Sequence, residues 1–150
     1  MEKGTINNRK VVKGKLKFNL KFIKTRMHKT FLILASALGA LTVMIGAFGA
    51  HALKSHLTKI GRTEVFETAV KYQFYHTIAI FLLGLLLLKV EHRLFHLSGY
   101  CFAAGIVIFS GSLYMLCLTN VGKWGAVTPF GGLLLIAGWI MMAIGISKTL

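Results

Sequence analysis

The chain has few acidic residues and none of the common catalytic motifs. Four of its 150 residues are acidic, all of them glutamate, against 18 lysines and arginines, so the net charge is +14. No carboxylate pair is placed for acid–base chemistry, and neither a phosphate-binding loop nor a G-x-S-x-G context around a serine is present. We therefore predict that the protein is not an enzyme, and we predict no cofactor and no bound metal.

Cysteine is also scarce. The two cysteines, Cys101 and Cys117, fall within one apolar segment. Sixteen residues of continuous helix separate them by about 24 Å, at 1.5 Å per residue, which is too far for a disulfide bond. We interpret both as small apolar packing residues, so they indicate no redox compartment.

The excess of positive charge has two interpretations. A net charge of +14 is typical of proteins that bind nucleic acid. Here, however, the lysines and arginines flank long apolar segments, as membrane topology requires, and no recognised nucleic-acid motif is present. We predict a protein that contacts the lipid bilayer and binds no nucleic acid.

Apolar residues make up 55% of the chain and gather into four blocks. The blocks cover residues 30–53, 66–88, 97–118 and 128–146. About 20 helical residues span a hydrocarbon core of roughly 30 Å, and a backbone in that core must satisfy its own hydrogen bonds. The sequence therefore predicts an all-α membrane protein, a bundle of four transmembrane helices within residues 30–150. The second block reaches the required length only if its helix carries Tyr72, Gln73 and His76 into the membrane.

A basic tail, residues 1–29, precedes the first block and holds ten of the 18 lysines and arginines. Such a tail is attracted to anionic lipid, by about 1 kcal/mol per cation near the surface. With both termini on one side, thirteen of the 18 cations lie there, so the positive-inside rule predicts cytoplasmic termini. A second interpretation is that translation starts at Met27, which leaves four cations inside against five outside.

Small residues recur every seven positions in three of the blocks. A seven-residue repeat keeps one stripe of a helix toward its partner, and small side chains let helices approach closely in lipid. We predict helix packing at Gly39, Gly46, Gly49, Gly105, Gly131, Gly138 and Gly145, with Ser98 and Ser112 extending the stripe of the third block. The second block has only Gly84 and long leucine runs, so we predict that it is the helix most exposed to lipid.

Polar side chains gather near one end of the blocks. With cytoplasmic termini, an up-and-down bundle brings them together in its outer half as a candidate polar cluster: His51, Tyr72, Gln73, His76, Ser110, Ser112, Tyr114 and Thr128. Ionisable residues inside a membrane are costly and are candidates for function. Each residue also has a structural interpretation, as an interfacial anchor or a hydrogen-bonded packing residue. Both interpretations stay open for His76, which lies deepest.

Four segments resemble the YgdD-like bacterial inner-membrane proteins. They are GAFGAH at 46–51, FETAVKYQFYH at 66–76, FSGSLY at 109–114 and TPFGG at 128–132. The match runs from residue 27 to residue 146 with similar spacing, while the first 26 residues depart from it. The resemblance implies four membrane helices in the bacterial cell (inner) membrane. It supplies no activity, cofactor or catalytic residue, because the family is described as a domain of unknown function.

Three functions are compatible with these features. The first, which we prefer, is a non-catalytic membrane scaffold that binds a membrane protein partner or forms a homo-oligomer. The second is an oligomeric transporter or channel for protons or a small solute, using His76, Gln73, Ser110 and Tyr114. The third is a haem or redox protein with His51 and His76 as ligands.

Overall fold

The computed structural model describes residues 28–149, which form helices and no strands. The elements are a first helix (His28–Ala50), α2 (Lys54–Lys59), α3 (Thr63–Leu86), α4 (Arg93–Thr119) and α5 (Lys123–Thr149). All but α2 are long and apolar enough to cross a membrane, so the predicted all-α fold with four spans is confirmed. The predicted basic tail falls almost wholly outside the described residues, as does the alternative start at Met27.

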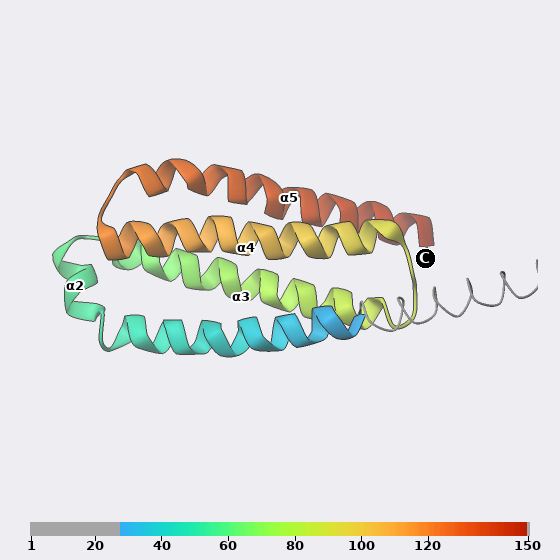
Figure 1. Ribbon diagram of the computed structural model, residues 1–150, viewed down its shortest axis with the longest axis horizontal. Helices are drawn as coiled ribbons and strands as arrows, with labels where there is room; N and C mark the ends of the chain where they lie inside the picture. Colours follow the sequence, from blue (N-terminus) through green and yellow to red (C-terminus); the bar gives the residue numbers. More distant parts are fainter. Residues whose placement is uncertain (1–27, 150) are drawn as a thin grey trace, which may run out of the picture.

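The four long helices run alternately up and down and lie beside one another in chain order (Figure 1). The first helix and α5 form the two edges, and α3 and α4 lie between them. Accordingly, the share of each helix's most apolar stretch that is buried inside the bundle is 44% for α3 and for α4, but 17% for the first helix and 22% for α5. The prediction that the second block is the most lipid-exposed is therefore wrong. Leucine content misled it, because lipid tails are as apolar as leucine and composition does not separate the two surroundings.

The helix ends differ from the predicted ones by a few residues. The fourth block was predicted to begin at residue 128, but α5 begins at Lys123, so Pro129 lies inside the helix. Proline has no backbone N–H, so the carbonyl of Gly125 receives no helical hydrogen bond from position 129. The short helix α2 was not predicted, and its buried Leu57 anchors it to the bundle.

Three phenylalanine–glycine pairs join α4 to α5 in antiparallel register. They recur every seven residues and are Phe95 with Gly145, Phe102 with Gly138 and Phe109 with Gly131. A Cβ added at Gly138 would lie 2.6 Å from the Phe102 ring, and one at Gly131 would lie 2.3 Å from the backbone nitrogen of Phe109. Real Cβ atoms essentially never come within 3.0 Å of a non-bonded heavy atom of another residue. The close approach of these two helices therefore requires glycine at these positions.

The first helix lies close to α3 at some of its glycines and farther from it at others. Gly49 faces the Phe66 ring, which lies 2.2 Å from the position of an added Cβ. At Gly46 and Gly39 the nearest atoms would be 3.5 and 3.8 Å away, which is ordinary van der Waals contact. Two glycines that were not predicted as packing positions also make close approaches: Gly84 to Leu32 and Gly99 to Phe31.

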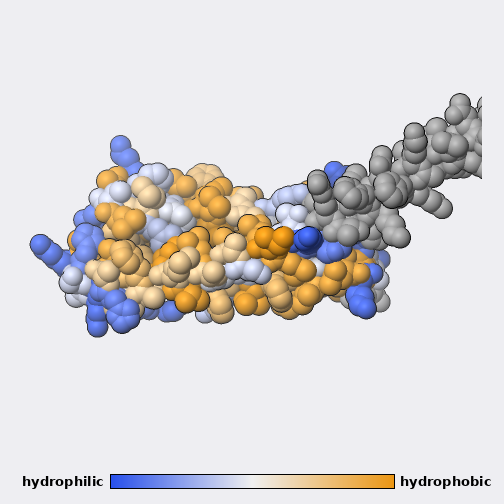
Figure 2. Space-filling view, turned by 60° about the horizontal axis from the view of Figure 1, so that its bottom comes forward, coloured by the Kyte–Doolittle hydropathy of each residue, from blue (hydrophilic) through white to orange (hydrophobic). Residues whose placement is uncertain are grey.

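The surface of the bundle suits a bilayer. Figure 2 shows apolar side chains over the middle of the molecule and hydrophilic ones toward its ends. Several large apolar side chains are well exposed, including Val43 at 68% and Val107 at 70%. An apolar band of this extent between hydrophilic ends is what the hydrocarbon core of a membrane covers.

Candidate functional site

Gln73 lies at the centre of a hydrogen-bond network that joins three helices. It belongs to α3, and its side chain is 3% exposed. Its Nε2 donates to Thr42 Oγ1 of the first helix at 2.8 Å, and its Oε1 accepts from the Tyr114 hydroxyl of α4 at 3.0 Å. Thr42 in turn donates to the Leu38 carbonyl at 2.7 Å. Both ends of the Gln73 amide are thus satisfied by protein groups inside the membrane span. We call these residues the Gln73 network.

His76 lies one turn further along α3 and is 6% exposed. Its Nδ1 is 2.8 Å from the Tyr72 carbonyl, which can only accept, so Nδ1 carries the proton and donates. The indole Nε1–H of Trp139 on α5 donates to His76 Nε2 at 3.2 Å. The neutral ring with its proton on Nδ1 therefore satisfies both partners. In this arrangement neither ring nitrogen is free to bind a metal or to exchange a proton with a substrate.

Aromatic rings surround the His76 imidazole. The Tyr72, Phe102 and Trp139 ring centroids lie 6.0, 5.7 and 6.2 Å from it. An open groove of about 490 Å³ runs past the rings of Tyr72, His76 and Trp139 between α3 and α5, with Phe109 of α4 among its lining residues. The groove is mainly apolar, and the polar groups of His76 and Trp139 in its lining bond each other, which suits contact with lipid chains.

The other predicted residues lie apart from these two centres. The Ser112 and Thr128 hydroxyls are 2.8 Å apart and connect α4 to α5. Ser110 is 1% exposed, and its hydroxyl has no partner; the same holds for the buried hydroxyl of Thr77. His51 follows the end of the first helix, is exposed, and lines an open surface with Lys54 and other residues of α2.

The predicted polar cluster is therefore divided among separate contacts. Gln73 with Tyr114, Tyr72 with His76, and Ser112 with Thr128 are brought together, whereas His51 is not. The sequence analysis missed Thr42 and Trp139. Thr42 looks like any isolated hydroxyl in an apolar block, but Trp139 did carry a signal, because tryptophan normally lies at the membrane interface and this one lies mid-span.

The placement of the histidines bears on the predicted haem alternative. In the described range no three histidine, cysteine or acidic side chains converge. His51 and His76 line different surfaces, one at the end of the bundle and one between α3 and α5. The two histidines are therefore not placed as the axial ligands of one haem.

Known relatives share most of the length of this chain. Residues 45–132 match the family model described as Protein of unknown function (DUF423). A UPF0382 membrane protein of Staphylococcus haemolyticus is 41% identical over 120 residues, which are 80% of this chain and 97% of the relative. The UPF0382 membrane protein YwdK of Bacillus subtilis is 38% identical over 123 residues, 81% and 99% of the two chains. The UPF0382 inner membrane protein YgdD of Escherichia coli is 40% identical over 114 residues, 76% and 86%. No solved structure matches.

Proposed function

This chain belongs to the family described as Protein of unknown function (DUF423) and is a multi-pass bacterial membrane protein, and we propose that it acts as a non-catalytic scaffold that binds a partner inside the bilayer. Its relatives carry names that state a membrane location and no catalytic activity. The partner is a second copy of the chain or another membrane protein.

The use of the buried polar side chains carries this proposal. Gln73, His76 and Ser112 each hydrogen-bond a side chain of another helix. A group that already bonds a neighbouring helix becomes available to a substrate only if the bundle opens. Interhelical hydrogen bonds of this kind stabilise membrane helix association. The polar residues therefore support a structural role for the bundle.

The outward face of the first helix supports a protein partner. Short side chains are exposed there at alternating spacings of four and three residues: Ser36, Ala40, Val43 and Ala47. This spacing forms a continuous stripe along a helix, and short side chains allow a second helix to come close in lipid. The first helix buries only 17% of its most apolar stretch within its own bundle, so the stripe is open to a partner.

Association in mild detergent tests the scaffold proposal. Light scattering after size-exclusion chromatography gives the oligomeric state, and mass spectrometry identifies any co-purifying membrane protein. We expect the double substitution Ala40→Leu and Ala47→Leu to disrupt the association, because it fills the stripe. Val107→Leu, at an exposed position of α4, is the control and should leave it intact. A wild-type protein that is a monomer without a partner contradicts the proposal.

We also propose the inner membrane, with both termini on the cytoplasmic side. The location is supported by the name of the Escherichia coli relative. The orientation is supported by the ten cations of residues 1–29, which would then face anionic lipid on the cytoplasmic side. A reporter that works only in the cytoplasm is expected to be active when it is fused to the carboxyl end. Activity of a reporter that works only on the outer side would contradict the orientation.

The transporter alternative has less support. A path for protons or solutes needs polar groups that can change partners along it. Among the described residues, the buried hydroxyls without a partner are those of Thr77 and Ser110. Vesicles containing the wild-type protein are expected to show no flux above vesicles containing His76→Ala; a clear excess would favour transport.

A further inference from the structure

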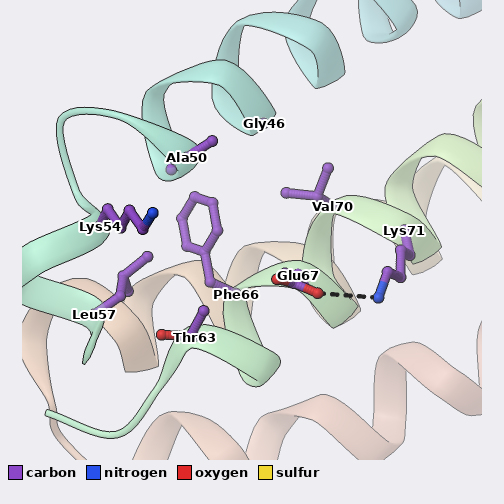
Figure 3. Close-up of a pocket in the computed structure, with 10 residues that line it drawn as sticks. Gly46, Ala50, Lys54, Leu57, Thr63, Phe66, Glu67, Val70 and Lys71 are labelled. Atoms are coloured by element: carbon purple, nitrogen blue, oxygen red, sulfur yellow. Dashed lines mark hydrogen bonds and ion pairs between the residues drawn. The ribbon is translucent and has the colours of Figure 1, made fainter.

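A cavity of about 350 Å³ lies where the first helix ends and α3 begins, next to α2 (Figure 3). Gly46 and Gly49 line it from the first helix, Phe66 and Val70 from α3, and Leu57 from α2. This volume is at the lower end of the range of small-molecule pockets, about 300–1,000 Å³. The cavity is separate from the Gln73 network and from the groove beside His76.

Two glycines of the first helix shape this cavity. Phe66 packs its ring edge against the bare backbone of Gly49, where an added Cβ would lie 2.2 Å from Cε1. One turn earlier, Gly46 faces Val70 at a looser distance, since a Cβ there would be 3.5 Å from Cγ1. The cavity beside the Phe66 ring is thus an apolar slot between two helices.

A cation without an acidic partner stands at the mouth of the slot. Figure 3 shows Lys54 extending from the start of α2 toward Ala50 and the Phe66 ring. On another side Lys71 forms an ion pair with Glu67, with 3.1 Å between Nζ and Oε2. The ion pairs among the described residues are this one and that of His96 with Glu91, so Lys54 is not neutralised by a carboxylate.

We infer that this cavity binds one anionic phospholipid, with an acyl chain in the slot and the phosphate on Lys54. The slot lies at the end of two membrane-spanning helices, where headgroups and the first methylenes of lipid chains meet. The apolar walls match an acyl chain, and the unpaired ammonium matches a phosphate. This inference requires only a membrane location and holds whether or not the chain acts as a scaffold.

Native mass spectrometry of the full-length protein, delipidated and then titrated with phosphatidylglycerol, tests this site. Lys54→Gln is expected to weaken the tightest phosphatidylglycerol binding about fivefold, the effect of one cation beside anionic lipid. Lys59→Gln is the matched control, because it removes a charge from the same helix outside the cavity lining. Phosphatidylcholine titrated in parallel should bind more weakly to the wild type and respond less to Lys54→Gln.

Gly46→Leu provides a second, steric test. It fills the slot and is expected to abolish the tight phosphatidylglycerol site while the helical circular dichroism spectrum is kept. Equal lipid binding by the wild type, Lys54→Gln and Lys59→Gln overturns the inference. So does a Gly46→Leu variant that keeps its lipid but loses self-association, because the slot would then hold a helix of a second copy.

Discussion

The α4–α5 pair and the pair formed by the first helix and α3 are both antiparallel, but they are held together differently. On α5, Gly131 and Gly138 lie so close to α4 that a methyl group has no space. On the first helix, Gly39 and Gly46 have space for one. The first pair therefore fits closely over most of its length, while the second fits closely near its two ends, at Gly84 and at Gly49, and leaves a cavity beside Gly49.

We interpret the difference as a small membrane bundle that combines a closely packed pair of helices with a more loosely packed one. Lipid provides no hydrophobic driving force between helices, so close packing and hydrogen bonds must hold them together. The α4–α5 pair combines close packing along its length with the bonds of Ser98 to the Gly138 carbonyl and of Ser112 to Thr128. The first helix is joined to the bundle by the bond between Thr42 and Gln73 and by Phe31, which packs against Gly99 of α4. We propose that the first helix is the part that adapts to a partner.

The largest effect is expected for Gly131→Ala. The new Cβ would lie 2.3 Å from the backbone nitrogen of Phe109, and a backbone atom cannot rotate away. Overpacking of this kind typically costs about 1–3 kcal/mol, and we expect the upper end of that range. Gly46→Ala is the matched control in the looser pair and should stay within about 0.5 kcal/mol of the wild type. Thermal unfolding in detergent measures both; equal losses would remove the distinction between the two pairs.

A smaller effect is expected for Gln73→Leu. It removes the bonds to Thr42 and Tyr114, and interhelical hydrogen bonds in membranes contribute about 0.6 kcal/mol on average. We expect a loss of about 1 kcal/mol for the two bonds. Combining it with Tyr114→Phe should add little further loss, because both substitutions remove the same bond. Strictly additive losses in this double-mutant cycle would show that the bond between Gln73 and Tyr114 does not form in the membrane.

Much of the fold could be predicted from the sequence, because apolar blocks of sufficient length become membrane helices. The seven-residue spacing also identified the α5 glycines that lie against Phe95, Phe102 and Phe109. The order of helices in the bundle could not be predicted, since lipid and neighbouring helices are equally apolar. Consequently the central position of α3 was missed.

The candidate site was less predictable than the fold. Polar residues such as Gln73 and His76 were identified individually, because polar groups stand out in an apolar block. Their partners Thr42 and Trp139 lie 31 and 63 residues away along the chain, and only the packing of helices brings them together. His51 was grouped with them by sequence position alone, but it follows the end of its helix and faces outward.

The central claim is that α5 is held in the bundle more tightly than the first helix. Cutting the chain at two loops tests this claim most directly. One variant carries a protease site at Gly61, which separates the first helix and α2 from the rest, and the other carries it at Gly122, which separates α5. After cleavage and dilution in mild detergent, we expect α5 to stay bound to its fragment and the first helix to dissociate. Retention of the first helix together with loss of α5 would contradict the account.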